Sequence, residues 1–229
     1  MIKDPPLLTM RRAFERPTAL EIAGFANVPT GHAVDALGGR GALDYRIKPL
    51  APIQSVMVGV AITCHCGPAD NLALFAALAE ARSGDVLIAS TDGFAGTSIT
   101  GDLLMGMARN RGVKGLVTDG LARDVAGILG VGLPVYCGGL SPNSPARNGP
   151  GSVGLPVVVG GVAIESGDIV IGDDDGVVVI PRRAANDVLA RLSDVRAAES
   201  SLEVKVKACL EIPDFIRSVL VSDRIVEVS

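Results

Sequence analysis

Short apolar runs separated by glycine and polar residues recur through the middle of the chain. Residues 86–90 and 115–119 are apolar stretches of strand length, a pattern typical of strands that are buried on both faces. Between them, Asp102 begins a helical pattern that reaches Arg111 and ends at Gly112. A strand, helix and strand of this size predict a parallel crossover, which brings the loops after the two strands to one edge of the sheet. Ligands in open α/β sheets bind at that edge.

The C-terminal third shows two further patterns. Residues 157–180 predict several short strands, and residues 182 to about 210 predict a long, mostly polar helix. The helix has a single apolar stripe for packing, formed by Val188, Leu189, Leu192 and Val195. Its polar face carries Arg196 and Glu199, so we expect this helix to lie against another subunit. The acidic run 173–176 ends in Asp-Gly between two apolar runs, which favours a hairpin turn over a cation site.

Length and composition indicate the class of protein. A chain of 229 residues with 28 glycines and 3% aromatic residues is typical of a glycine-rich α/β protein. We therefore interpret residues 1–229 as one domain, with an N-terminal helical segment over about 1–40 and the C-terminal helix over about 182–210.

Charge and hydropathy argue against several classes of partner. The net charge of −4 provides no basic field for a nucleic acid, and the absence of Trp, with only two Tyr, leaves few platforms for stacking bases. No apolar run approaches the roughly 18 residues of a membrane span, and the first residues lack the apolar core of a signal peptide. We expect a cytoplasmic protein that binds neither nucleic acid nor membrane.

Three motifs have simpler structural interpretations. On a strand, Cys64 and Cys66 would share one face and His65 would point to the other, and no further ligands lie at zinc-site spacing. His32 has no Ser or Cys partner for a nucleophilic triad. Residues 149–154 match the dinucleotide fingerprint by letter, but they lead into a strand instead of a helix, so we expect no nucleotide cofactor.

The strongest candidate for chemistry is the start of the predicted helix at Gly101, Asp102, Leu103 and Leu104. Backbone N–H groups in the first turn of a helix lack partners within the helix and lie at its positive end, so a substrate carboxylate could bind there. Gly101 has no side chain and would let the carboxylate approach closely. Asp102 could hold a water molecule or move a proton. An acidic residue at this position is also a common stabilising charge at a helix start.

A second group follows after 20 intervening residues, at Arg123 and Asp124. Arg123 offers a planar set of donors for a carboxylate or enolate oxygen. Asp124 could bind Mg²⁺, which takes one or two carboxylates and keeps several waters. Alone, the two residues could be a surface ion pair worth less than about 1 kcal/mol. The combination with Gly101 and Asp102 favours a site for a 2-oxo acid.

At these residues the chain resembles the class II 4-hydroxy-4-methyl-2-oxoglutarate and 4-carboxy-4-hydroxy-2-oxoadipate aldolases, a family that also contains the RraA-type regulators of ribonuclease E. The resemblance runs from about residue 30 to residue 181, and its motifs lie at 67–72, 83–87, 101–104, 119–124 and 167–177. The spacing of Asp102 from Arg123 and Asp124 is the specific part, since the regulators keep the Arg but lack the full acidic set. The chain is thus similar to the enzyme branch.

The resemblance implies a swivelling β/β/α fold, like that of phosphohistidine domains, in homotrimers or homohexamers with sites between subunits. It implies that Asp124 ligates Mg²⁺ or Mn²⁺, that Arg123 contacts the 2-oxo acid, and that the amides of residues 101–104 hold its carboxylate. An acidic residue of a neighbouring subunit would complete the water shell of the metal. Glu199 is the first candidate for that residue, and Glu203 is the alternative.

The expected reaction is metal-dependent cleavage of a 4-hydroxy-2-oxo acid to pyruvate, with oxaloacetate decarboxylation as a side activity. Lys114 lies at the start of a strand, so no lysine is placed for a Schiff base. Many relatives have a basic residue where this chain has Gly138, which makes a tricarboxylic substrate less expected. The alternatives are a regulator that binds a ribonuclease without catalysis and a dedicated oxaloacetate decarboxylase.

Overall fold

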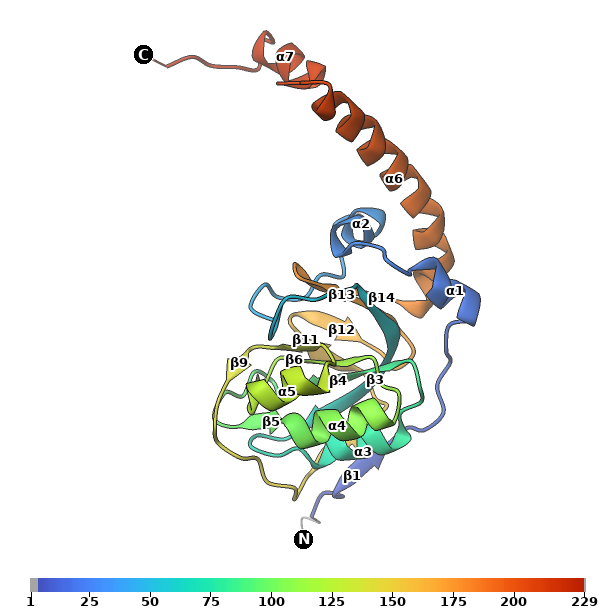
Figure 1. The fold of residues 1–229 in the computed structure, drawn as a ribbon, viewed down its shortest axis with the longest axis vertical. Coiled ribbons are helices and arrows are strands. Elements are labelled where there is room, and N and C mark those ends of the chain that lie inside the picture. Colours follow the sequence, from blue (N-terminus) through green and yellow to red (C-terminus); the bar gives the residue numbers. More distant parts are fainter. Residues whose placement is uncertain (1–3, 229) are drawn as a thin grey trace.

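The computed structural model of the protein describes residues 4–228 and is shown in Figure 1. Its helices are α1 (Ala19–Gly24), α2 (Thr30–Ala36), α3 (Leu72–Glu80), α4 (Asp102–Asn110), α5 (Val125–Val131), the 3₁₀ helix η1 (Arg182–Ala184), α6 (Ala185–Lys207) and α7 (Asp214–Leu220). Its strands are β1 (Leu8–Met10), β2 (Lys48–Pro49), β3 (Met57–Cys66), β4 (Asp85–Ser90), β5 (Ser98–Thr100), β6 (Gly115–Thr118), β7 (Leu121–Ala122), β8 (Val135–Cys137), β9 (Gly139–Leu140), β10 (Gly151–Val153), β11 (Val157–Val159), β12 (Val162–Ile164), β13 (Ile169–Asp173) and β14 (Gly176–Ile180).

The main sheet is mixed, with a parallel centre. Its strands follow the order β1-β10-β3-β4-β6-β8-β2, and the hairpin of β13 and β14 joins it through antiparallel pairing of β13 with β3. The four central strands β3, β4, β6 and β8 are parallel neighbours. The expected α/β class and the parallel crossover from β4 through α4 to β6 are therefore confirmed.

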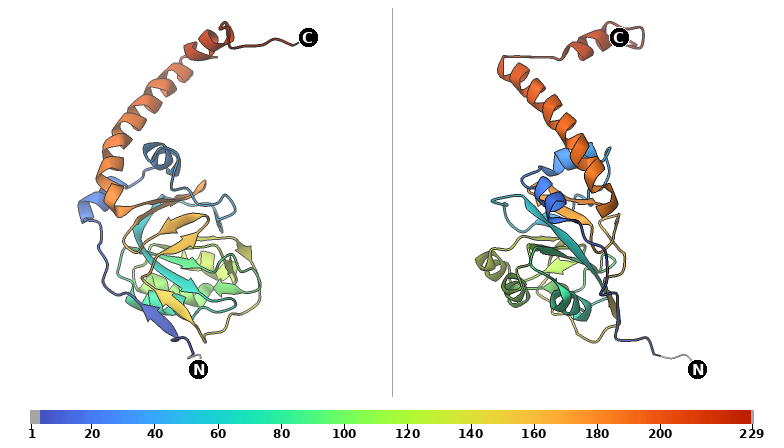
Figure 2. Two further views of the ribbon diagram at one scale, coloured as in Figure 1. Left: turned by 180° about the vertical axis from the view of Figure 1, so that it is seen from behind. Right: turned by 90° about the vertical axis from the view of Figure 1, so that its right-hand side faces the viewer.

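Apolar side chains on the two faces of the sheet pack against different layers. On one face, the sheet packs against α3, α4 and α5, with Leu87, Leu116 and Met105 among the fully buried side chains. Figure 2 shows these helices grouped on one side of the sheet. On the other face, Val86 and Ile88 pack against residues of β11 to β14. This alternation explains why β4 is apolar at every position but its ends, Asp85 and Ser90.

A third apolar cluster joins the hairpin of β13 and β14 to α1, α2 and α6. Val188 and Leu192 of α6 are buried there, while Leu189 and Val195 are partly buried at its edge. The apolar stripe predicted from the sequence is thus the part of α6 that packs on the body of the protein. The acidic run forms the predicted turn, because Asp173 pairs with Gly176 across the hairpin.

The two ends of the chain differ from the central layers. The segment that we expected to be helical over about 1–40 contains α1 and α2, but it begins with β1, which pairs with β10. The second half of α6 and α7 extend away from the body as an arm (Figure 1). In the part of the chain that the structure describes, no helix is both long enough and apolar enough to cross a membrane.

Candidate active site

A second, small sheet brings the candidate residues together. Strands β5, β7 and β9 pair in parallel in that order, so their carboxyl ends lie side by side. The segment after β5 is Gly101 and Asp102, the segment after β7 is Arg123 and Asp124, and the segment after β9 begins at Ser141. Three loops that are distant in the sequence therefore form one site.

Backbone hydrogen bonds fix these three segments. The Arg123 N–H donates to the Thr100 carbonyl oxygen at 3.1 Å, and the Ser141 N–H donates to the Ala122 carbonyl oxygen at 3.0 Å. Asp119, at the end of β6, accepts hydrogen bonds from the N–H groups of Thr91 at 2.7 Å and Gly93 at 3.1 Å. Asp119 thus ties the loop after β4 to the loop after β6, which is a structural role.

The site is a small cleft of about 110 Å³. All six residues predicted at its centre line it, namely Gly101, Asp102, Leu103, Leu104, Arg123 and Asp124. Leu104 is buried and anchors the start of α4 in the core, whereas the Leu103 side chain is 80% exposed. The cleft lies at the start of α4.

Glycines set the distances within this cleft. A Cβ atom at Gly101 would lie 2.7 Å from Oδ2 of Asp124, so only glycine lets the two segments approach this closely. Gly127 in α5 has the same role, because a Cβ there would lie 2.6 Å from Oδ2 of Asp102. The absence of these two side chains brings both carboxylates into the cleft.

Arg123 and Asp124 form an ion pair, with Nε 3.1 Å from Oδ2, and their side chains are 35% and 45% exposed. A further Arg123 nitrogen donates to the hydroxyl of Ser144 in the loop after β9. Asp124 has a positive φ of 56°, which directs the chain into α5. Because one Asp124 oxygen faces Arg123, the other oxygen can bind a cation.

One of the backbone amides at the start of α4 already has a hydrogen-bond partner. The Leu103 N–H donates to Oδ1 of its neighbour Asp102 at 2.7 Å. A substrate carboxylate would therefore compete with Asp102 for the Leu103 amide, while the amides of Asp102 and Leu104 remain first-turn groups of the helix. This local contact depends on a side-chain rotamer, which the sequence does not specify.

Glu199 and Glu203 lie on α6, and neither lines the cleft within one chain. Glu199 contacts Nε2 of His32 and is 59% exposed, and Glu203 pairs with Lys207 at 2.5 Å along the same helix. A role for either residue in the site therefore requires a second copy of the chain.

Seven residues that line the cleft were missed by sequence reasoning: Asn71, Phe75, Ser98, Ile99, Thr100, Pro145 and Arg147. Arg147 lies in the loop after β9, and its guanidinium carbon is 5.0 Å from the centre of the Phe75 ring. Arg147 thus supplies the cleft with a basic residue besides Arg123, although Gly138 takes the place of the basic residue found in many relatives. Gly138 cannot supply one, because a Cβ there would lie 2.9 Å from the Asp119 carbonyl oxygen.

The oxygen donors in the cleft fit a hard divalent cation. Asp102 and Asp124 both line the cleft, and Gly101 leaves the approach to Asp124 open. Among residues 4–228, no three His, Cys, Asp or Glu side chains gather into a metal-binding cluster. A cation here would have one or two carboxylates and several waters, which is the coordination that Mg²⁺ accepts.

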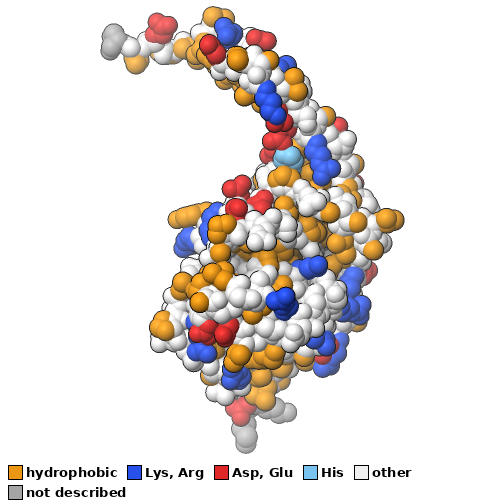
Figure 3. Space-filling model, viewed as in Figure 1, with side chains coloured by type: hydrophobic (Ala, Val, Ile, Leu, Met, Phe, Trp, Pro, Cys, Tyr) orange, Lys and Arg blue, Asp and Glu red, His pale blue; other side chains and the backbone are white. Residues whose placement is uncertain are grey.

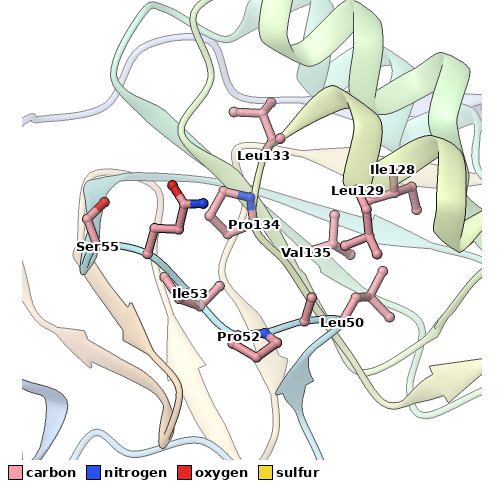
Figure 4. Close-up of a pocket in the computed structure, with 12 residues that line it drawn as sticks. Leu50, Pro52, Ile53, Ser55, Ile128, Leu129, Leu133, Pro134 and Val135 are labelled. Atoms are coloured by element: carbon pink, nitrogen blue, oxygen red, sulfur yellow. The ribbon is translucent and has the colours of Figure 1, made fainter.

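A larger cavity of about 460 Å³ lies between the loop at residues 50–55 and α5 (Figure 4). Its lining is mostly aliphatic, with Leu50, Ile53, Leu129 and Leu133 among its residues, and it contains no ionisable side chain. It offers no group for acid, base or metal chemistry, so the smaller cleft is the candidate active site.

The Cys64-His65-Cys66 motif behaves as expected for a strand. Both cysteines are buried, and His65 points to the other face, where its Nε2 lies 3.0 Å from Asp92. A hydrogen bond with Cys66 and burial both raise the pKa of Cys64 well above its ordinary value. The thiol therefore stays protonated and is a poor metal ligand or nucleophile.

Comparison with known proteins identifies the family. The family model described as "RraA-like: Aldolase/RraA" matches residues 30–179, which include every strand of the small sheet and the whole cleft. The chain belongs to the RraA-like family. The expected α/β fold of this family is confirmed by solved structures as well as by the strand order above.

Individual relatives of this RraA-like protein come from both branches of the family. A protein of Halalkalibacterium halodurans named "Putative 4-hydroxy-4-methyl-2-oxoglutarate aldolase" is 36% identical over 182 residues, which cover 80% of this chain and 86% of the relative. A Streptomyces coelicolor structure, described as an unusual member of the RNase ES inhibitor RraA family, has 30% identity and a TM-score of 0.74, covering 83% and 99% of the two chains. The RNA-processing inhibitor RraA of a Thermus species has 26% identity and a TM-score of 0.61, covering 67% and 93%.

Proposed function

We propose that this RraA-like protein is a lyase that cleaves a 4-hydroxy-2-oxo acid to pyruvate and a second oxo acid, with the help of Mg²⁺ or Mn²⁺. Candidate substrates are 4-hydroxy-4-methyl-2-oxoglutarate and 4-carboxy-4-hydroxy-2-oxoadipate. The observation that carries the proposal is the meeting of Arg123, Asp124 and Asp102 in one cleft at the start of α4. The relative named for this aldol substrate supports it.

Different residues of the cleft would bind the substrate carboxylate and the cation. The first-turn amides of α4 would hold the carboxylate next to the 2-oxo group. Asp124 would hold the cation, with Asp102 binding one of its waters. When bound, the cation acts as a Lewis acid toward the 2-oxo group. Glu199 of a neighbouring copy would complete the set of acidic groups.

Arg123 would stabilise the charge that develops on the 2-oxo oxygen. Breaking the bond between C3 and C4 leaves its electron pair on the pyruvate fragment as an enolate, whose negative charge lies largely on that oxygen. Arg123 has five N–H donors, and its contacts with Asp124 and Ser144 leave donors for this oxygen. Preorganised donors of this kind account for large rate effects in enzymes.

Two proton transfers complete the reaction. The 4-hydroxyl must lose a proton as C4 becomes a carbonyl carbon, and C3 of the enolate must gain one. Asp102, which lines the cleft, would take the first proton, directly or through a water, and would help to return the second. The same enolate forms when oxaloacetate loses CO₂, so oxaloacetate decarboxylation should be a side activity.

The proposal is tested by measuring pyruvate release from 4-hydroxy-4-methyl-2-oxoglutarate and from oxaloacetate, with Mg²⁺ and with EDTA. We expect turnover that requires the metal and is lost in Arg123→Ala. Absence of turnover of both substrates by folded, metal-loaded protein would overturn the proposal.

A second candidate is a regulator that binds a ribonuclease without catalysis. It is favoured by the similarity to the Streptomyces protein of the RNase inhibitor family. The acidic set discriminates between the two functions. Arg123→Ala and Asp124→Ala should abolish turnover of an enzyme, whereas a regulator with these substitutions should keep its partner. A dedicated oxaloacetate decarboxylase would show turnover of oxaloacetate alone.

A further inference from the structure

One wall of the cleft has no role in the chemistry above. It is formed by Asn71, Thr100 and Arg147, which we call the basic wall. Asn71 is 4% exposed and Thr100 is 3% exposed, and both line the cleft. Arg147 is exposed, so its charge is accessible from the solvent. The wall therefore combines a cation with two buried polar side chains.

Both buried side chains carry a polar atom that has no partner within the described chain. Nδ2 of Asn71 donates to the Ile99 carbonyl oxygen at 2.8 Å, which fixes the orientation of the side-chain amide. Its Oδ1 is an acceptor that receives no hydrogen bond from the described chain. The Thr100 hydroxyl is also buried without a partner. A buried polar atom without a hydrogen-bond partner destabilises the fold, so these atoms indicate a bound polar ligand.

The position of Arg147 is set by the backbone around it. The Ala146 N–H donates to the Ala69 carbonyl oxygen at 2.7 Å, and the Asn71 N–H donates to the Ala146 carbonyl oxygen at 3.0 Å. The buried carboxylate of Asp70 also accepts from the Gly149 N–H at 3.1 Å. With its guanidinium stacked on Phe75, Arg147 keeps the edges of the group free for an anion.

We propose that the basic wall binds a second carboxylate and the adjacent hydroxyl of the substrate. Arg147 and the Thr100 hydroxyl would donate to the carboxylate, and Oδ1 of Asn71 would accept from the hydroxyl. Both candidate substrates named above have a carboxylate on the carbon that bears the hydroxyl, so the basic wall would be the part of the cleft that selects them over 4-hydroxy-2-oxo acids without it. This inference rests on the proposed function, because the first carboxylate is taken to bind at the start of α4.

The basic wall contacts only the fragment that leaves after cleavage, since pyruvate retains the first carboxylate and the 2-oxo group. Its residues should therefore set substrate preference and leave binding of a monocarboxylate unchanged. Neither a guanidinium nor a carboxamide serves as a general acid or base in proteins. Their roles are binding and positioning.

Binding of two matched probes tests this assignment without turnover. 2-Oxoglutarate and 2-oxopentanoate have the same chain length and differ by the second carboxylate. Using calorimetry with Mg²⁺, we expect wild type to bind 2-oxoglutarate more tightly, and Arg147→Ala to weaken that binding about 10- to 100-fold. Binding of 2-oxopentanoate should change less than about twofold. If Arg147→Ala lost affinity equally for both probes, or for neither, the proposal would be overturned.

Two pairs of variants control for structure and general charge. Arg40 is exposed and lies outside the cleft, so Arg40→Ala should preserve the preference. Thr100→Val removes the hydroxyl at constant shape and should weaken binding of 2-oxoglutarate alone. Thr97 also has a buried hydroxyl without a partner in the described chain, but it does not line the cleft, so Thr97→Val is the matched control.

The outcomes separate this proposal from the proposed function. Cleavage of 4-hydroxy-2-oxo acids with an unchanged probe preference in Arg147→Ala would overturn the basic wall alone. A preference that depends on Arg147, in a protein that cleaves neither substrate, would support the wall and overturn the aldolase. Failure of wild type to bind either probe would overturn both.

Discussion

Individual glycines determine how closely the parts of the cleft approach one another. Gly101 lies against Asp124, Gly127 lies against Asp102, and Gly138 lies against the Asp119 backbone. A Cβ atom at any of these three positions would lie less than 3.0 Å from the neighbouring atom, which is too close for a side chain to fit without a shift. The sequence singled out Gly101 for substrate access, and the structure shows that it also makes room for the side chain of Asp124.

Gly101→Ala tests this role directly. Its Cβ would displace the Asp124 carboxylate, so we expect at least tenfold weaker Mg²⁺ binding and a similar loss of pyruvate release. Gly106 lies in the same helix, and a Cβ there would meet nothing within 4 Å. Gly106→Ala should leave metal binding unchanged and increase the free energy of unfolding by about 0.5–1 kcal/mol. Equal metal affinity in both variants would contradict the account.

The predictable residues are those with a local signal. Gly101 to Leu104 and the pair Arg123 and Asp124 stood out because a glycine precedes a helix and an acidic set follows at fixed spacing. Arg147 gave no such signal, because its place depends on pairing of its loop with residues 69–71, far away in the sequence. The contact of Glu199 with His32 likewise joins two distant helices.

At the scale of elements, the long apolar runs were predictable and the shortest strands were not. Strand β4, helix α4, strand β6 and the hairpin of β13 and β14 have clear patterns of hydrophobic residues. Strands β5, β7 and β9 contain two or three residues each, which is too short for a periodic pattern. That small sheet is nevertheless what aligns the three loops of the cleft.

Asp168 links the two segments that flank the hairpin of β13 and β14. Its carboxylate accepts from the N–H groups of Glu165 at 2.9 Å, before β13, and Arg182 at 3.0 Å, after β14. In Asp168→Asn the amide nitrogen would face one of these donors. We expect the free energy of unfolding to fall by about 1–3 kcal/mol, as measured by urea denaturation at neutral pH.

The stability advantage of wild type over Asp168→Asn should decrease as the pH rises. Burial raises the pKa of Asp168 above its ordinary value, although its backbone hydrogen bonds act in the opposite direction. The folded protein therefore binds this proton more readily than the unfolded chain. As the pH rises from about 4 through the raised pKa, wild type should lose stability relative to Asp168→Asn, which does not titrate there. A stability difference that grows over this interval would contradict the assignment.

At the scale of the whole molecule, the arm formed by the end of α6 and α7 carries many exposed apolar side chains (Figure 3). They include Leu202, Val204, Phe215 and Leu220. Exposed apolar residues in this number are typical of a surface that another chain covers. We expect a homotrimer or homohexamer in which α6 brings Glu199 to the cleft of a neighbour.

Mixing of inactive variants tests whether sites are shared. Arg123→Ala and Glu199→Ala should each lose most activity, because each lacks one part of the site. After dissociation and reassembly together, some sites would combine an intact cleft with an intact Glu199. We expect pyruvate release to recover to a fraction of wild type, with light scattering reporting the oligomer. Activity that never recovers in verified mixed oligomers would place Glu199 outside the site.

The most direct test of the central claim is exchange of the methyl protons of pyruvate in D₂O, followed by NMR. This measurement needs no knowledge of the physiological substrate, because an enolate stabilised at Arg123 and Asp124 must take up deuterium from the solvent when it is reprotonated at C3. We expect exchange with Mg²⁺ that stops with EDTA and in Arg123→Ala. Absence of exchange above the rate without protein, in folded wild type loaded with Mg²⁺, would contradict it.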